Sequence, residues 1–277
     1  PYLGGILGCA WVNGAQSVDG VAACGKHFAC NEFEYLRMAS DSRVNKRPLH
    51  ELYLRHFEML VKDAKVKCLM TGYNKTNGTY MCSNAPLLDK VLRKEWGFDG
   101  VVMSDWYGTH DTVGSAYGNL LDLEMPGPVF VRGQKLVDAV RSGKLREDDI
   151  DKHVERILKL TENLKGKMGP GTNCDHSNER PGPNDPKDVQ LLQKLSRESL
   201  VLLKNEANVL PLPKREDIKI TLYGPNAAHY SITGGGSVET LPPTPVTIET
   251  AFCEAFPNAN VQVQDFTNVD LEVANGR

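Results

Sequence analysis

"VKCLMTGYNKTNGTYMCSNAPLLDKVLRKEWGFDGVVMSDW", residues 66–106, is the stretch that decides the fold. Residues 66–74 are typical of a buried strand, residues 84–97 of an amphipathic helix that a glycine ends, and residues 100–106 of a second strand. A strand, a helix and a strand joined by short loops indicate parallel α/β structure. The second strand runs into Asp105, which either caps the next helix or is a catalytic group aimed into a pocket.

The same alternation continues on both sides of this stretch. The expected elements are a strand over 20–28, a helix over 48–64, a strand-like run over 120–127 and helices over 133–143 and 146–166. Unusual polar residues fall where strands end, at Lys26-His27, Tyr73-Asn74 and Asp105-Trp106. A TIM-type barrel keeps its active site at this end of its strands. Since only about four strands are present, we interpret residues 1–166 as the C-terminal half of a TIM-type (β/α)8 barrel.

The remaining residues indicate a linker and a second, smaller α/β domain. Residues 167–190 are rich in Pro, Gly, Asn and Asp, which is typical of a linker. Over 191–277 the expected elements are a helix leading into a strand (191–213), a strand with a turn (219–227), a Gly-rich loop (231–240), a helix within 244–257 and a strand over 260–267. The chain opens on "PYLGGILGCA" without a Met, so we expect it to be cut from a longer protein.

The composition excludes several classes of function. Hydrophobic residues make up 40% of the 277 residues, which is enough for a packed core. The formal net charge is -3 and no long Lys/Arg run is present, so neither nucleic acid nor an anionic membrane is expected as a partner. No apolar stretch approaches the roughly 20 residues of a membrane span, and no signal peptide is recognised.

The cysteines and the Gly-rich loop give no reason to expect a metal or a cofactor. The seven cysteines are an odd number without CxxC spacing, so mostly reduced, buried thiols are expected, and an intracellular setting is favoured over a secreted one. The sequons that begin at Asn74 and Asn77 could carry glycans in a secretory setting. The "GGGS" loop lacks the spacing of a dinucleotide site, so no nucleotide is expected there.

Several motifs, in this order along the chain, resemble glycoside hydrolase family 3, and most of all its β-glucosidases. They are "KHFACNEFEYLRM", the run from Met70 to Trp106, "LDLEMPGP", "SRESLVLLKNEANVLPL" and "YGPNA". The resemblance implies a TIM-like barrel, a linker and an α/β sandwich. It also implies a retaining, exo-acting β-glycosidase without cofactor or metal. Its partners would be β-linked gluco-oligosaccharides or aryl and alkyl β-glucosides.

The resemblance assigns roles residue by residue. Asp105 matches the nucleophile, and Trp106 matches the indole that walls the sugar site. Lys26 and His27 match the pair that binds hydroxyls of the terminal sugar. The further site residues are Arg37 near that pair, Tyr73 and, less firmly, Met70 around the nucleophile, and Ser237 in the sandwich loop that leans over the sugar.

Some groups and some alternatives stay open at this point. The resemblance places the acid/base Glu and two further sugar-binding residues outside this chain, so we expect the 277 residues alone to be inactive. Glu32, Glu34 and Glu124 are interpreted as structural or solvated. The alternatives are a β-xylosidase of the same family, a non-catalytic sugar-binding chain, and a barrel lyase that would use Lys26 as a Schiff-base amine. The oligomeric state is not predicted.

Overall fold

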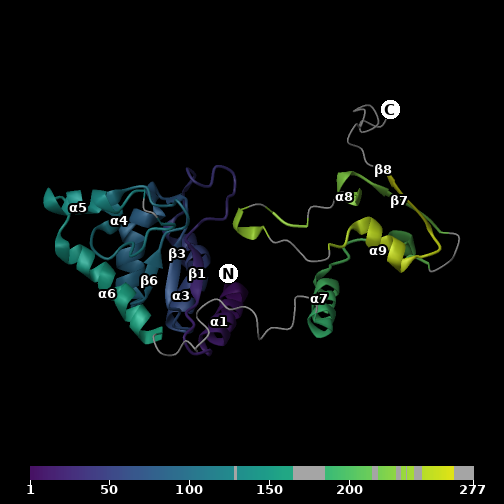
Figure 1. The fold of residues 1–277 in the computed structure, drawn as a ribbon, viewed down its shortest axis with the longest axis horizontal. Helices are drawn as coiled ribbons and strands as arrows, with labels where there is room; N and C mark the ends of the chain where they lie inside the picture. Colours follow the sequence, from purple (N-terminus) through teal and green to yellow (C-terminus); the bar gives the residue numbers. More distant parts are fainter. Residues whose placement is uncertain are drawn as a thin grey trace. The chain divides into compact units, whose positions relative to one another are not determined.

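The computed structural model describes residues 1–127, 130–164, 185–213, 218–228, 232–234, 236–239 and 245–264. The chain divides into two compact units, residues 1–175 and residues 176–277, which are described separately (Figure 1). The predicted limits of 1–166, 167–190 and 191–277 for barrel, linker and sandwich stay a prediction. Of the predicted linker, residues 167–184 lie outside the described residues.

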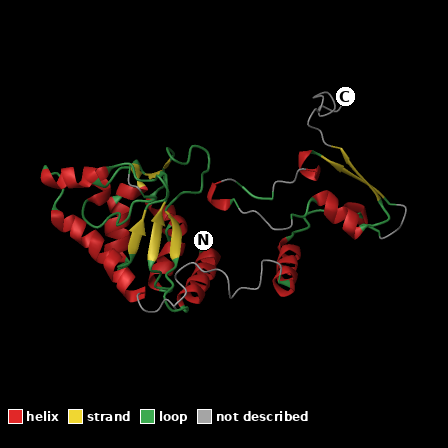
Figure 2. Ribbon diagram, in the orientation of Figure 1, coloured by secondary structure: helices red, strands yellow, loops and turns green. Residues whose placement is uncertain are grey.

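A parallel sheet forms the centre of the first unit (Figure 2). Its strands are β1 (Cys24–Phe28), β3 (Cys68–Thr71) and β6 (Val101–Met103), in the order β1-β3-β6. A single parallel bridge from Met103 to Leu123 extends the sheet to the next segment. Each strand therefore lies beside its successor in the chain, which is how strands follow one another in the wall of a TIM-type barrel.

Helical segments accompany this sheet, and several of them bury apolar side chains in a core that they share with its strands. They are α1 (Tyr2–Gln16), α2 (Lys46–Pro48), the π-helical segment η1 (Leu49–Tyr53), α3 (Arg55–Lys62), the short 3-10 turn η2 (Met81–Ser83), the π-helix η3 (Pro86–Glu95), α4 (Thr112–Ala116), α5 (Gln134–Arg141) and α6 (Glu147–Leu164). Phe28 of β1, Leu88 of η3 and Val102 of β6 are fully buried in one core. None of the helices in the described part of the chain is long and apolar enough to span a membrane.

A small hairpin follows β3 at the end of the sheet that carries the polar residues. It consists of β4 (Lys75–Thr76) and β5 (Thr79–Tyr80), and β2 (Asp41–Ser42) pairs with β4. Asn77 and Gly78 form its turn with φ angles of 52° and 92°, the positive values that an Asn-Gly hairpin turn requires.

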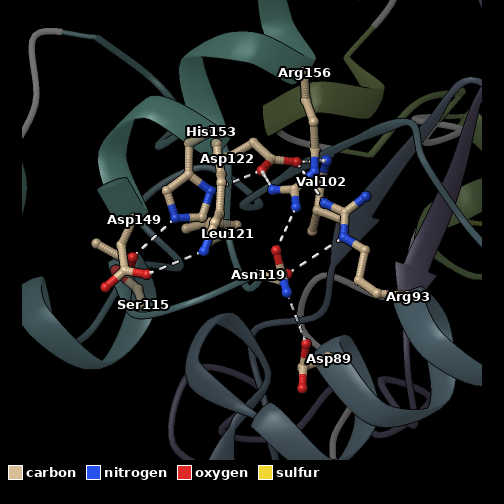
Figure 3. Close-up of polar contacts among 12 residues, drawn as sticks. Asp89, Arg93, Val102, Ser115, Asn119, Leu121, Asp122, Asp149, His153 and Arg156 are labelled. Atoms are coloured by element: carbon tan, nitrogen blue, oxygen red, sulfur yellow. Dashed lines mark hydrogen bonds and ion pairs between the residues drawn. The ribbon is translucent and has the colours of Figure 1, made fainter. Parts of the chain in front are cut away.

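A buried carboxylate joins the helices to the sheet (Figure 3). The side chain of Asp122 accepts hydrogen bonds from Arg93 of η3 at 2.6 Å, and from His153 and Arg156 of α6 at 2.8 Å each. It also accepts the backbone N–H of Val102 in β6 at 2.7 Å. Three elements that are distant in the sequence are thereby attached to one residue.

The second unit contains a β-α-β arrangement. Its strands β7 (Lys219–Tyr223) and β8 (Asn260–Gln264) are parallel, with Lys219 opposite Asn260. The helical segments described there are α7 (Pro186–Ser199), η4 (Glu206–Asn208), α8 (Pro225–Ala228), η5 (Gly236–Val238) and α9 (Ile248–Ala255). This matches the expectation of α/β structure over these residues.

Three local predictions differ from the structure. Residues 186–190 belong to α7 rather than to a linker, because Asp185 caps the helix through the N–H of Lys187 at 2.8 Å and Pro186 occupies its first turn. Residues 200–203 form no strand, since they have no sheet partner among the described residues. The run 120–127 contributes one bridge instead of a full strand.

Candidate active site

Three parallel strands end at the same edge of the sheet and bring the predicted polar residues together. β1 supplies Lys26 and His27, the segment after β3 supplies Tyr73, and the segment after β6 supplies Asp105 and Trp106. Because the carboxyl ends of parallel strands meet at one edge, residues that are far apart in the sequence become neighbours there.

Asp105 lies at the centre of this group and is 8% exposed. One carboxylate oxygen, Oδ2, is 3.2 Å from Nε2 of His27. The other, Oδ1, accepts the backbone N–H of Trp106 at 2.8 Å, and the hydroxyl of Tyr73 also donates a hydrogen bond to the carboxylate. The carboxylate is thus surrounded by donors from all three strand ends.

The structure decides against a capping role for Asp105. The next helix, α4, starts at Thr112, and its cap is Asp111, whose Oδ1 accepts the N–H of Val113 at 3.1 Å. Asp105 is therefore not the cap of this helix.

The surroundings of Asp105 fix the protonation of its two side-chain neighbours. Burial raises the pKa of Tyr73 to about 12, and the negative charge of Asp105 and its hydrogen bond act in the same direction. Burial lowers the pKa of His27, an effect that Asp105 opposes and that Lys26 and Arg37 reinforce. At neutral pH, Tyr73 therefore keeps its proton, and His27 is held toward its neutral form.

Two cationic side chains flank this pair. The guanidinium of Arg37 lies 4.9 Å from the centre of the Tyr73 ring and forms an ion pair with Glu34 at 3.2 Å, the structural partnership expected for that glutamate. Lys26 is exposed on β1, while His27 is half-buried, so the two neighbours point in different directions.

The remaining predicted residues have different positions. Trp106 is 41% exposed, which leaves an indole surface beside Asp105 open to a ligand. Met70 is buried within β3, in register with Met103 of β6. Ser237 is exposed in η5 of the second unit, and its role over the sugar stays a prediction.

Sequence reasoning missed Gly108, which lies against the backbone of Asp105 and the ring of Tyr73. Its N–H donates to the carbonyl of Asp105 at 2.9 Å. A Cβ at this position would lie 3.1 Å from that carbonyl oxygen and 3.4 Å from Cδ1 of Tyr73. The signal was present as a glycine three residues after Asp105, where backbone and ring approach closely.

The carboxylate of Glu124 binds backbone N–H groups. Its carboxylate accepts the N–H groups of Phe130, Val131 and Arg132 at 3.2, 2.9 and 2.8 Å. This geometry favours the structural interpretation of Glu124 over a role as an acid. No group of side chains suited to hold a metal ion occurs within the described part of the chain.

The chain is similar to known proteins over most of its length. The Glycosyl hydrolase family 3 N terminal domain matches residues 1–160, and the Glycosyl hydrolase family 3 C-terminal domain matches residues 200–275. The chain belongs to glycosyl hydrolase family 3.

Similar curated proteins bear the name β-glucosidase. A "Beta-glucosidase" of Rhizobium radiobacter is 45% identical over 260 residues, which are 94% of this chain and 31% of that protein. A "Probable beta-glucosidase I" of Neosartorya fischeri is 44% identical over 235 residues, 85% of this chain and 27% of that protein. The chain thus spans about a third of the length of these relatives.

Solved structures give the same architecture. The β-glucosidase of Kluyveromyces marxianus in complex with glucose superposes with a TM-score of 0.76 at 36% identity, over 89% of this chain and 29% of that one. β-Glucosidase 3B of Thermotoga neapolitana, also with glucose, gives 0.74 at 36% identity over 97% and 35%. The mixed α/β structure therefore corresponds to part of a TIM barrel followed by part of a sandwich domain, as predicted.

Proposed function

We propose that the protein carrying this chain is a retaining, exo-acting β-glucosidase whose nucleophile is Asp105. The observation that carries the proposal is the buried carboxylate of Asp105 at the strand ends, held by His27 at 3.2 Å and by the hydroxyl of Tyr73. Family membership and the names of the relatives support the substrate class, terminal β-D-glucosyl groups of oligosaccharides or of aryl and alkyl glucosides.

The proposed reaction has two steps. An oxygen of Asp105 attacks the anomeric carbon, the glycosidic bond breaks, and the leaving oxygen takes a proton from the general acid. Water then attacks the same carbon and gives its proton to the conjugate base of that acid, the bond from that carbon to Asp105 breaks, and glucose leaves with its original configuration. The resemblance to the family implies an acid/base outside these 277 residues, and Glu124, which accepts three backbone N–H groups, keeps its structural interpretation.

The other residues prepare the carboxylate and hold the sugar. Neutral donors at His27 and Tyr73 fix the orientation of the Asp105 carboxylate without a cation directly against it. Trp106 offers a partly exposed indole for the C–H face of a sugar, while Lys26 and His27 hold its hydroxyls. The guanidinium of Arg37 lies 4.9 Å from the centre of the Tyr73 ring and supports it, and Met70 lies beside the nucleophile in the proposed site. A β-xylosidase would need the same residues around the nucleophile and differ in the depth of the pocket.

The test is a nucleophile replacement in the full-length protein. Asp105→Ala should lower kcat on an aryl β-glucoside by several orders of magnitude, because a covalent step loses its nucleophile. Added azide should restore part of the rate and give the α-glucosyl azide. A slow 2-deoxy-2-fluoro glucoside should add one sugar to the wild-type protein, on the peptide that contains Asp105. An Asp105→Ala enzyme within about tenfold of the wild-type kcat would rule out this assignment.

A further inference from the structure

The two strand ends that hold Asp105 are themselves joined by one buried amide. Asn74 directly follows Tyr73 and is 1% exposed. Its Nδ2 group donates across to the carbonyl of Ala29, two residues after His27, at 3.2 Å. The same group donates to the carbonyl of Lys75 at 3.0 Å and to Oγ1 of Thr76 at 3.2 Å.

Further hydrogen bonds link the segments that follow β1 and β3. The hydroxyl of Thr76 is 3.4 Å from the carbonyl of Ala29, and the N–H of Gly72 donates to the carbonyl of Phe28 at 2.7 Å. Gly72 leaves space for this arrangement, since a Cβ there would lie 2.5 Å from Oδ1 of Asn74 and 2.9 Å from Cβ of Asn31. The segments after β1 and β3 are therefore packed tightly on both sides of Tyr73.

We propose that Asn74 is a positioning residue that sets the separation of His27 and Tyr73, and through them the orientation of the Asp105 carboxylate. His27 and Tyr73 approach that carboxylate from two different segments, and Asn74 bonds one segment to the other. No contact of Asn74 with a sugar is required. The inference rests on the proposed function, because it assigns the support of the same nucleophile.

The expected consequence follows from geometry. Loss of the Nδ2 group leaves the carbonyl of Ala29 with the longer 3.4 Å bond from the Thr76 hydroxyl, and this weaker link lets the two segments separate. A displacement of about 1 Å at a reacting group can reduce turnover by about 10²-fold. Because Asn74 acts on the nucleophile and not on sugar affinity, the loss should fall mainly on kcat and on the rate of covalent trapping by a fluoro-sugar.

Asn84 provides a matched control. It is 3% exposed, and its amide donates to the carbonyls of Thr76 and Thr79 at 3.2 and 3.5 Å, while its Oδ1 accepts the N–H of Leu87. Asn84 therefore supports the same hairpin as Asn74, but it makes no bond to the segment after β1. Replacing either residue removes one buried amide of equal size.

The experiment compares Asn74→Ala, Asn84→Ala and Thr76→Val in the full-length protein. Circular dichroism checks folding, and kcat, KM and the rate of fluoro-sugar trapping are measured well below each unfolding midpoint. We expect Asn74→Ala to lower kcat and the trapping rate about 10- to 100-fold, with KM and the Asn84→Ala enzyme within about threefold of wild type. Thr76→Val keeps the side-chain shape, removes one acceptor of Asn74, and should lower kcat by a smaller factor.

Two outcomes would overturn the inference. One is equal loss of kcat in Asn74→Ala and Asn84→Ala, which would make Asn74 a general support of the hairpin. The other is an unfolded Asn74→Ala protein together with a folded Thr76→Val enzyme of wild-type kcat. Neither outcome touches the proposed function, which fails only if the wild-type protein does not hydrolyse β-glucosides or if Asp105→Ala retains activity.

Discussion

Replacing Asp122 with Asn should destabilise the first unit strongly. The Asp122 side chain is fully buried and lies against Arg93 at 2.6 Å and against His153 and Arg156 at 2.8 Å. Asparagine has nearly the same shape but no charge, so the substitution leaves the guanidinium groups of Arg93 and Arg156 without a counter-charge. The effect is severe for Arg93, because its burial lowers its pKa to about 10 even with Asp122 present.

The magnitude follows from the difference between buried and exposed ion pairs. Removing one partner of a buried pair costs about 3–5 kcal/mol, whereas an exposed pair contributes about 0–1 kcal/mol. Asp122→Asn should therefore lower the free energy of unfolding by about 3–5 kcal/mol. Asp99→Asn is the matched control, since Asp99 pairs with Lys159 at 2.9 Å through largely exposed side chains and should cost about 1 kcal/mol or less.

The pH dependence has a definite sign. Burial acts to raise the pKa of Asp122, but the hydrogen bond from His153 and the charges of Arg93 and Arg156 outweigh it, so the pKa falls below its usual range. A carboxylate with a lowered folded pKa contributes stability above its unfolded pKa of about 3.9. That contribution is lost as the pH falls through the folded value. The difference between wild type and Asp122→Asn should therefore be full at pH 7 and shrink below about pH 4.

Urea unfolding of the full-length proteins, followed by circular dichroism at pH 7 and pH 3, measures both effects. If Asp122→Asn stays within about 1 kcal/mol of wild type at pH 7, or if the gap is unchanged at pH 3, the network does not hold the unit as argued.

Other substitutions test the site itself. Lys26→Met and His27→Ala should each lower kcat/KM by roughly 10²-fold or more, because hydroxyl contacts strengthen as the sugar ring flattens; a rise in KM with unchanged kcat would contradict this. Glu124→Gln should cost about 1–3 kcal/mol of stability through its backbone partners and leave the rate constants near wild type. The 277-residue chain alone should not turn over cellobiose, since an unactivated leaving group needs an acid worth about 10²–10⁴-fold; turnover that Glu124→Gln abolishes would place the acid inside the chain.

The strands and helices around Asp105 could be predicted because each has a clear period and a short connection. Helix α1 could not, because its sequence "YLGGILGCAWVNGAQ" contains four glycines, and glycine disfavours an isolated helix. Its packing supplies the reason for the helix. A Cβ on Gly5 would collide with the sulfur of Met59 in α3, so glycine permits a close approach that no local propensity reveals.

The strand expected over 120–127 fails for an equally specific reason. The N–H of Val102, which a continued ladder could use, donates to the Asp122 side chain at 2.7 Å. The N–H groups of Asp122 and Leu123 both reach the carbonyl of Val102, so regular pairing stops there. The hydrogen bond from the N–H of Val102 to the Asp122 side chain therefore stands where the pattern over 120–127 predicted regular strand pairing.

The site residues could be placed at strand ends from sequence, but not their contacts. The pattern located His27, Tyr73 and Asp105 at the ends of three different strands. It gave no sign that His27 and Tyr73 contact Asp105 directly, because those contacts depend on the register of β1, β3 and β6. Asn74 was placed at a strand end as well, but its bond to Ala29 could not be predicted for the same reason, since Ala29 belongs to a different strand end.

Two buried carboxylates of the first unit, Asp105 and Asp122, have different surroundings. The difference explains why we propose a catalytic role for Asp105 and a stabilising role for Asp122. Asp122 has a fully buried side chain whose oxygens already accept from two arginines, a histidine and a backbone N–H, so no lone pair is left to attack carbon. The Asp105 side chain is 11% exposed and is held by the hydroxyl of Tyr73, a backbone N–H and a His27 whose pKa burial lowers. Such donors orient a carboxylate without neutralising it. Of the two, Asp105 alone is accessible and oriented without a paired cation directly against it, which supports its proposed role as the nucleophile.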